Sequence, residues 1–313
     1  MKIVNKIYGD LLQIKKSESI LIICDKRTKN IAEIFFENGF NYGNKSLCFE
    51  IPEGKQNGEE PAPEIAKLFL QFDILLLITT KSLTHTNAVK KAAKKGARIV
   101  TMPGIKKDTL ERCVDINYKE LQKLHNKIYK NMKKVKFVRV TTKIGTDIKF
   151  KIYNNKIWYK TSMNKKGDLH NIPIGEVYVS PLENTAEGVY VVDASQAGIG
   201  ILKKPIAIKV EKGMITKIGG GKEANKLAEI LKKVKNKKAY NIAELGIGTN
   251  PKAKIIGSIL EDEKVKGTCH IAIGNNYGLG GKVNVPIHLD GIIKSPTIYF
   301  DDKIIMKEGK FLI

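Results

Sequence analysis

Residues 270–290, HIAIGNNYGLGGKVNVPIHLD, bring two of the chain's five histidines into one short stretch. His270 and His288 each lie in a run that predicts a β-strand, at 268–273 and 283–293, and a glycine-rich turn joins the two runs. Because alternate side chains of a strand share a face, His288 and Asp290 point the same way, and His270 can face them across the hairpin. The stretch predicts either a hydrogen-bonded His and Asp pair or a site for zinc, cobalt, manganese or iron(II).

Two further carboxylates interrupt apolar runs elsewhere in the chain. Glu176 follows Gly175 in NIPIGEVYVSP (171–181), and Glu244 lies within AYNIAELGIGTNP (239–251). A buried carboxylate costs free energy unless it is paired or binds a cation. Each acid by itself is most simply satisfied by a lysine or by backbone amides. Together with the aspartate and the two histidines of the first stretch, they are enough for a two-metal site, in which one ion polarises a carbonyl and the other lowers the pKa of bound water.

The first third of the chain alternates apolar runs with helical patterns. This alternation is typical of a parallel sheet with helices on both faces, so it predicts a Rossmann-like α/β layout. The first predicted strand is followed by CDKRTKNIAEIF (24–35), which has no glycine, and no GxxxxGK[ST] occurs, so no nucleotide cofactor is expected. His85 lies in a polar cluster after the third strand and is a weaker site candidate, since helix-capping loops commonly have this composition. The predicted strands are 19–24, 46–51, 74–79 and 98–102, and the predicted helices are 28–38, 63–72 and 86–95.

A change of pattern near residue 135 predicts two domains. A long helical pattern at 115–134 is expected to end or bridge the first domain, and short strands and turns follow it. We therefore expect a Rossmann-like α/β domain at 1–135 and a mainly β, α+β metal-binding catalytic domain at 136–313. One helix is predicted among the later strands, at 223–234, and His125 is expected at the surface or at its boundary.

Composition limits the classes of partner. The 313 residues carry a formal net charge of +23, which by itself would suggest nucleic acid. The lysines are spread along the whole chain, however, and neither a zinc-finger spacing nor an RNP-type aromatic motif occurs, so nucleic acid is not expected as the main partner. The four cysteines are far apart, with no CxxC, and are expected to be reduced and mostly buried, including Cys269. No apolar run of membrane length and no signal-like start is found, so a cytoplasmic protein without a membrane partner is predicted.

Four ordered segments, NIPIGEVYVSP, AELGIGTNP, GTCHIAIGNNYG and HLDGII, resemble the aminopeptidase T family of metallopeptidases over about residues 170–295. The resemblance implies a hydrolase that removes N-terminal residues from a peptide or small-molecule substrate with a metal-activated water. It also implies a homodimer in which domains of both subunits enclose the site. One of the two glutamates would serve as general base, and Tyr277 would assist. The metal ligands that the resemblance implies are Glu176, Glu244, His270, His288 and Asp290.

Several features depart from the peptidase pattern. Family peptidases commonly carry two acids where this chain has Gly175 and Glu176, so the resemblance leaves open whether one or two ions bind and whether the peptidase activity is kept. The fold also resembles that of the iron-dependent dihydroxypyridine ring-opening dioxygenases, in which a two-histidine, one-carboxylate site binds iron(II). A third alternative is a non-catalytic basic binding protein. The first expectation is a metallo-aminopeptidase with zinc, cobalt or manganese.

Overall fold

The chain divides into two compact units in the computed structural model, which describes residues 2–42 and 45–313. The first unit comprises Met1–Tyr118 and Lys160–Ile174, and the second comprises Lys119–Tyr159 and Gly175–Ile313. The polypeptide thus returns to the first unit for one short segment. The domain boundary near residue 135 stays a prediction. Within the described ranges, no helix combines the length and the apolar character that a bilayer crossing needs.

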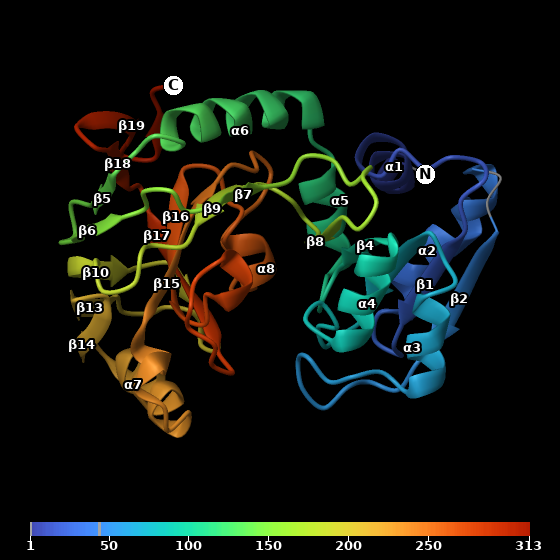
Figure 1. The fold of residues 1–313 in the computed structure, drawn as a ribbon, viewed down its shortest axis with the longest axis horizontal. Helices are drawn as coiled ribbons and strands as arrows, with labels where there is room; N and C mark the ends of the chain where they lie inside the picture. Colours follow the sequence, from blue (N-terminus) through green and yellow to red (C-terminus); the bar gives the residue numbers. More distant parts are fainter. Residues whose placement is uncertain (1, 43–44) are drawn as a thin grey trace. The chain divides into compact units, whose positions relative to one another are not determined.

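A five-stranded parallel sheet forms the first unit, in the order β2-β1-β3-β4-β8. Its central strands are continuous apolar runs, ILIIC in β1 (Ile20–Cys24) and ILLLI in β3 (Ile74–Ile78), and every residue in them is buried. Parallel strands covered on both faces read in this way, so the predicted α/β layout is confirmed. The edge strand β8 (Leu169–Asn171) comes from the returning segment and lies beside β4 (Arg98–Thr101) (Figure 1). This strand is not predicted from the sequence, because three residues are too few to show a periodic pattern.

The remaining elements of the first unit connect these strands. A π-helical segment of seven residues lies near its start. The elements are α1 (Lys2–Val4), η1 (Asn5–Leu11), α2 (Lys29–Gly39), η2 (Phe40–Tyr42), β2 (Ser46–Glu50), α3 (Pro63–Phe69), α4 (Asn87–Lys95) and α5 (Lys107–Val114).

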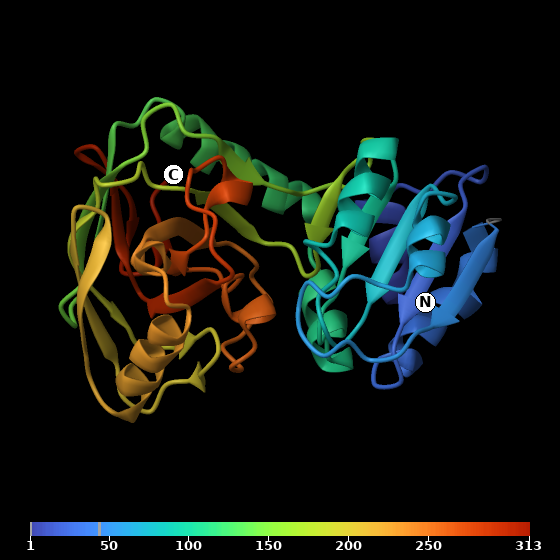
Figure 2. The same ribbon diagram turned by 60° about the horizontal axis from the view of Figure 1, so that its bottom comes forward.

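Two antiparallel sheets form the second unit. One has eight strands in the order β14-β13-β10-β6-β5-β18-β19-β20, and the other has seven in the order β12-β11-β17-β16-β15-β9-β7. One cluster of buried apolar side chains joins both sheets with helices α6 and α7, as Val140, Ile271 and Leu227 illustrate. Helix α7 lies along the hairpin of β13 and β14 (Figure 2). The predicted mixture of strands with a single long helix in this part of the chain is confirmed for residues 222–233.

The second unit begins with α6, at the unit boundary, and its elements follow in chain order. They are α6 (Tyr118–Met132), β5 (Phe137–Thr141), β6 (Asp147–Lys151), β7 (Ile157–Tyr159), β9 (Glu176–Val179), β10 (Glu187–Val192), β11 (Ser195–Gln196), β12 (Gly200–Ile201), β13 (Ile206–Glu211), β14 (Met214–Gly219), α7 (Lys222–Lys233), η3 (Lys237–Tyr240), β15 (Ile242–Gly248), α8 (Ile259–Asp262), β16 (Thr268–Gly274), η4 (Tyr277–Leu279), β17 (His288–Lys294), β18 (Thr297–Phe300), β19 (Lys303–Lys307) and β20 (Lys310–Phe311).

Two details of the sequence-based picture are wrong. The second strand of the central hairpin begins at His288 and not at residue 283, because Pro286 has no N–H to donate to a strand ladder. His125 is fully buried and not at the surface: its Nε2 lies 2.7 Å from Oγ1 of Thr249, and its ring meets Tyr159 edge-on. The helical pattern shows which side of α6 is apolar. It does not show that Thr249, in the loop after β15, covers the adjoining side on which His125 lies.

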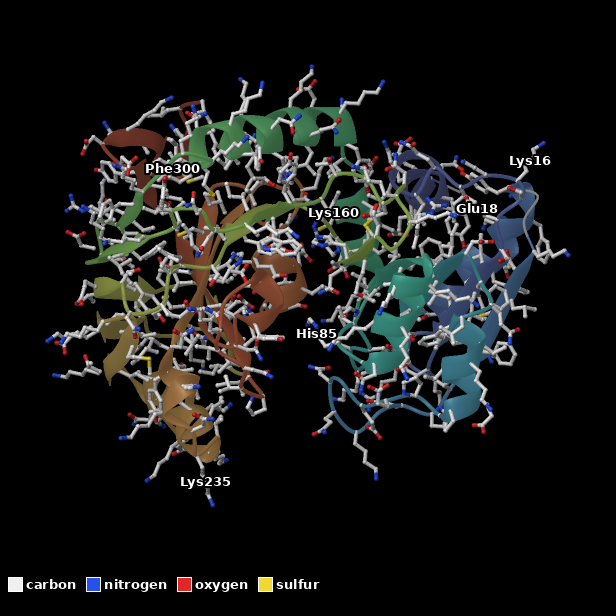
Figure 3. The ribbon with its side chains drawn as sticks, viewed as in Figure 1. Lys16, Glu18, His85, Lys160, Lys235 and Phe300 are labelled. Atoms are coloured by element: carbon white, nitrogen blue, oxygen red, sulfur yellow. The ribbon has the colours of Figure 1, made fainter. Side chains whose placement is uncertain are left out.

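The positive charge is carried largely by separate lysines at the surface. Lys16 in the first unit and Lys235 in the second are exposed and extend from loop positions (Figure 3). Exposed charges of this kind are solvated and require no partner. Lys264 differs, because its side chain is only 1% exposed. A fully buried ammonium group requires neighbouring acids, and these lie in the site described next.

Candidate metal centre

Five predicted site residues lie on one face of the seven-stranded sheet. They come from four neighbouring strands, β9, β15, β16 and β17 (Figure 1). In an antiparallel sheet, directly paired residues share a face with every second residue along each strand. The register pairs Glu244 with Ala272, Ala272 with Asp290, and Gly248 with Glu176, so the donors project to the same side. The five residues are Glu176, Glu244, His270, His288 and Asp290.

The opposite face of these strands belongs to the core of the second unit. Cys269, Ile271 and Ile273 of β16 alternate with the site positions and are fully buried in the apolar cluster. The prediction that Cys269 is a core residue is therefore confirmed. Burial of this face anchors the strands, so the polar side chains of the other face project from a fixed support.

Small residues leave room for the converging side chains. Gly246 lies directly opposite His270 in the ladder, and a Cβ atom built on this glycine would lie 2.0 Å from Nε2 of the imidazole. Ala272 is the residue between Glu244 and Asp290. A larger side chain at either position would fill the space over the sheet. The sequence thus keeps the floor of the site open where the donor atoms meet.

The donor atoms approach one another closely. Nε2 of His270 lies 3.4 Å from Oε1 of Glu244 and 3.5 Å from Oε2 of Glu176. Nε2 of His288 lies 3.2 Å from Oε2 of Glu244 and 3.4 Å from Oδ1 of Asp290. The Glu244 carboxylate therefore lies between the two imidazoles and contacts each with a different oxygen.

This donor set fits a divalent cation. Among the described residues, two groups offer ligand atoms that all lie within 4.8 Å of one another: Glu244, His288 and Asp290, and Glu176, Glu263 and His270. Two ligands about 2.1 Å from one ion and at right angles lie about 3 Å apart. The spacings of 3.2 to 3.5 Å are close to this value. Imidazole nitrogens and carboxylate oxygens suit zinc, manganese, cobalt and iron(II).

The surroundings of the two imidazoles direct their Nε2 atoms into the site. Nδ1 of His288 lies 2.7 Å from the backbone carbonyl oxygen of Asn275, to which it donates its proton. The Nε2 lone pair is then free for a metal, in the arrangement typical of ligating histidines. His270 is fully buried, and its Nδ1 finds no hydrogen-bond partner within the described part of the chain. Only its Nε2 faces the carboxylates.

The acids change the protonation of the site when no ion is bound. Burial would lower the pKa of His270, but Glu244, Asp290 and Glu176 outweigh burial and raise this pKa to about 9. Burial would likewise lower the pKa of His288, but Asp290 and Glu244 raise it well above its ordinary value. The histidines act on the acid in the opposite direction. Burial would raise the pKa of Asp290, but His288 and His270 hold this pKa below its ordinary value. The site is thus a strongly negative environment that favours positive charge.

Two residues of this region were missed in the sequence, Glu263 and Lys264, which follow α8. Nζ of Lys264 donates to Oε1 of Glu263 at 2.5 Å and also to Oε1 of Glu176. Burial raises the pKa of Glu263 to about 8, and although Lys264 opposes this rise, Glu176 and Asp290 add to it. The segment EDEKVK (261–266) has the composition of an ordinary exposed charged run. Only tertiary packing shows that Lys264 is buried, whereas Lys266 of the same segment is exposed.

The other predicted positions have different surroundings. Tyr277 lies in η4 with 65% of its surface exposed, and its assisting role stays a prediction. His85 is exposed in the loop between β3 and α4 of the first unit (Figure 3). Gly175, at the position of the missing acid, has φ 141°, and a Cβ atom there would lie 2.5 Å from Cβ of Asn250. An acidic side chain cannot be accommodated at residue 175 without moving this backbone.

An aromatic pair continues the same face of the sheet. Tyr178 of β9 pairs with Gly246, and Trp158 of β7 pairs with Tyr178, so both rings share the face of His270. The two rings are stacked, with centroids 6.5 Å apart and planes at 7°. Nε1 of Trp158 donates to the carbonyl oxygen of Leu279 at 3.1 Å, which fixes the indole. The stacked rings of Tyr178 and Trp158 therefore lie on the same face of the sheet as the metal ligands.

A family model and a curated relative point to the same family, and two solved structures share the fold. A family model described as 2,5-dihydroxypyridine 5,6-dioxygenase matches residues 10–313. A curated protein of that name from Pseudomonas putida KT2440 is 27% identical over 249 residues, which cover 75% of this chain and 70% of the relative. The solved 2,5-dihydroxypyridine dioxygenase from the same organism superposes with a TM-score of 0.85 at 20% identity, covering 99% of this chain and 96% of its own. AmpT from Thermus thermophilus superposes with a TM-score of 0.74 at 14% identity, covering 100% and 98%.

These matches correct the expectation of a metallo-aminopeptidase, and with it the description of the chain as a hydrolase or protease. The family model and the curated relative both carry the name of a dioxygenase, whereas AmpT is matched in fold alone. The closed backbone at Gly175 gives a physical reason, because the second acid of the peptidase pattern has no room there.

Proposed function

The chain belongs to the 2,5-dihydroxypyridine 5,6-dioxygenase family, and we propose on this premise that it is an iron(II)-dependent dioxygenase that opens a dihydroxylated, nitrogen-containing aromatic ring. The bond between ring carbons 5 and 6 would break, as the family name indicates. Both atoms of one O₂ would enter the product, so the ring is oxidised as O₂ is reduced and no further reductant is needed. The observation that carries the proposal is that His270 and His288 each contact the Glu244 carboxylate, and that His288 also contacts Asp290, on one face of the sheet.

The ligands of the ion would be His270, His288 and Asp290. Two histidines and one carboxylate form the set typical of non-haem iron(II) oxygenases, which leaves coordination positions open for the substrates. His288 is held by the Asn275 carbonyl, and His270 by burial, so their Nε2 atoms are pre-positioned. The bound iron would supply the redox-active centre at which O₂ and the ring react.

Glu244 would act as the base that accepts a proton from a ring hydroxyl. Its two oxygens lie at 3.4 Å and 3.2 Å from the two imidazole nitrogens. Burial would raise the pKa of Glu244, but His270 and His288 lower it below its ordinary value, so the carboxylate is ionised at neutral pH. A base must lie within hydrogen-bond reach of the proton that it takes. A substrate bound beside the two histidines would place its hydroxyl within reach of Glu244.

The aromatic pair would bind the face of the substrate ring. Tyr178 lies beside the metal ligands through its pairing with Gly246, and the stacked Trp158 supports it from behind. Offset stacking between aromatic rings contributes about 0.5–1.5 kcal/mol beyond the burial of area. This is a modest contribution to affinity, so the pair would orient the ring, and the metal ligands would fix its position.

The test measures metal content and O₂ consumption in the same set of variants. Protein is purified without a chelator or affinity tag for metals, loaded anaerobically with iron(II), and assayed with 2,5-dihydroxypyridine. His288→Ala and Asp290→Ala are expected to lose both iron and activity. Glu244→Gln is expected to keep one iron per chain and to lose activity. Asp302→Asn, an exposed aspartate of the turn between β18 and β19, serves as the control and should keep both.

Three results would argue against this assignment. Full iron binding and activity in Asp290→Ala would remove the proposed ligand set. Loss of iron in Glu244→Gln would place Glu244 among the ligands and take the role of base from it. Absence of O₂ consumption by the iron-loaded wild-type protein with dihydroxylated pyridines would contradict the proposed reaction itself.

A further inference from the structure

Lys264 occupies one of the two clusters of potential metal ligands. The cluster of Glu176, Glu263 and His270 offers one carboxylate oxygen or imidazole nitrogen from each residue. The ammonium group of Lys264 donates to Glu263 at 2.5 Å and to Glu176, and so lies among these donors. The other cluster, of Glu244, His288 and Asp290, has no lysine or arginine in contact with its carboxylates in the described part of the chain. The two clusters therefore differ in how their negative charge is balanced.

An ammonium group and a divalent ion compete for the same place. Both Glu176 and Glu263 direct an oxygen at Nζ, and Lys264 is only 1% exposed, so its charge is not screened by water. In such surroundings two cations within contact distance repel each other strongly. A lysine ammonium also donates three hydrogen bonds and coordinates nothing. Nε2 of His270 is a proposed ligand of the iron, so a second ion would depend on the carboxylates of Glu176 and Glu263. With Lys264 in position, this second ion would face repulsion and would lose both carboxylates.

The backbone holds Lys264 in this place. The backbone N–H of Asn250 donates to the carbonyl oxygen of Lys264 at 2.8 Å, and the N–H of Lys266 donates to the carbonyl oxygen of Asn250 at 3.0 Å. Asn250 is also the residue that closes the space beside Gly175. One packed segment therefore both fixes the lysine and excludes an acidic side chain from residue 175. Two features that would each reduce binding of a second ion thus share one structural cause.

We propose that the Lys264 ammonium replaces a second metal ion, so that the centre holds one divalent ion per chain and Lys264 is a positioning residue. Lys264 binds Oε1 of Glu176 and leaves Oε2 of this carboxylate facing Nε2 of His270, 3.5 Å away. The lysine thereby orients the acid beside a proposed iron ligand without touching the ion. This inference rests on the proposed function for the presence of the single ion. It goes further in assigning the stoichiometry to a named residue.

The test compares metal stoichiometry between wild type and Lys264→Met. Methionine keeps a long apolar side chain but removes the charge and the donors. Wild type is expected to bind one Mn²⁺ or Zn²⁺ per chain in calorimetric titration, with the count checked by elemental analysis after dialysis. Lys264→Met is expected to bind two. Lys266→Met removes the same charge from an exposed lysine two residues away and should remain at one ion per chain.

Thermal unfolding gives a second readout that a merely structural role would not produce. Lys264→Met should unfold at a lower temperature than wild type in metal-free buffer, because Glu176 and Glu263 lose their cation. A ligand that binds only the folded state raises the unfolding temperature. Addition of Mn²⁺ should therefore raise the unfolding temperature of Lys264→Met by more than it raises that of Lys266→Met. Equal shifts in the two variants would count against replacement of an ion by Lys264.

The outcomes separate this inference from the proposed function. Two ions in wild type would overturn the role of Lys264 and leave a metal centre in place. No ion in wild type would remove the premise of the proposed function as well. One ion in both wild type and a folded Lys264→Met would overturn the inference alone. If Lys264→Met fails to fold, Lys264→Gln, which also removes the charge, takes its place in the count: two ions would support the inference, and one ion would overturn it.

Discussion

Gly246 and His270 lie directly opposite each other on β15 and β16, and the glycine provides the space that the imidazole fills. The distance of 2.0 Å from a hypothetical Cβ at residue 246 to Nε2 of His270 is far below any real contact. The glycine in the segment AELGIG therefore has a positional meaning in the strand. It allows a histidine of the next strand to lie across the sheet towards Glu244 and Glu176.

Gly246→Ala should weaken metal binding without unfolding the protein. The added methyl group must displace His270, because the site offers no space between the two strands. Disturbing the orientation of a ligand typically lowers metal affinity by about 10- to 100-fold. Calorimetric titration with Mn²⁺ checks the loss, and Gly278→Ala, where a methyl group meets nothing within 4 Å, is the matched control. Equal affinities of the two variants would show that His270 does not depend on this space.

Asn275→Ala should lower metal affinity through His288. The Asn275 side chain donates to the carbonyl oxygen of Val285 at 2.7 Å and to Asn284 at 3.1 Å, and its own carbonyl oxygen accepts the Nδ1 proton of His288. Without the side chain, the turn loosens and the carbonyl no longer fixes the imidazole, so we expect a loss of about tenfold. Asn284→Ala keeps the shorter bond to Val285 and should lose much less. The ratio of the two dissociation constants is the deciding measurement.

Tyr178→Leu should raise KM for the ring substrate by about 2- to 10-fold, the range that loss of one aromatic contact represents. Iron content should stay unchanged, because Tyr178 is not among the proposed ligands. Tyr178→Phe keeps the ring, and its KM should remain at the wild-type value. A higher KM in Tyr178→Phe would instead assign the effect to the hydroxyl group.

His125 should make the second unit less stable below neutral pH. Burial lowers the pKa of His125 to about 3, whereas an unfolded histidine has a pKa of about 6.5. Between these values the unfolded state binds the extra proton, so the stability from neutral His125 is complete above pH 6.5 and decreases as the pH falls towards 3. From pH 7 to pH 5 the free energy of unfolding should fall by about 2 kcal/mol more in wild type than in His125→Gln.

Tryptophan fluorescence can follow this effect in the correct unit. The single tryptophan of the chain, Trp158, lies in the same unit as His125. Urea unfolding of wild type and His125→Gln at both pH values gives the difference, and the contributions of carboxylates common to both proteins cancel. An identical pH dependence in the two proteins would mean that His125 takes up its proton in the folded state without cost.

The sequence indicated much of the candidate site because the site lies on regular strands. Alternation in β16 and β17 placed His270, His288 and Asp290 on one face, and the apolar neighbours of Glu244 marked it as a buried acid that needs a partner. The sequence left the chemistry open between a peptidase and a ring-opening dioxygenase, because the chain is similar in fold to both a dihydroxypyridine dioxygenase and AmpT. The motif order alone therefore favoured the wrong reaction.

Amino-acid patterns by themselves determined the parallel α/β layout of the first part, several strands of the second, and which side chains of the metal centre share a face, since these depend on local periodicity. Tertiary structure alone decided the position of β8, the burial of His125, and the contact of Lys264 with Glu176 and Glu263. Each of these depends on segments far apart in the chain that pack together, and a charged run such as EDEKVK has the same composition whether water or two carboxylates surround its lysine.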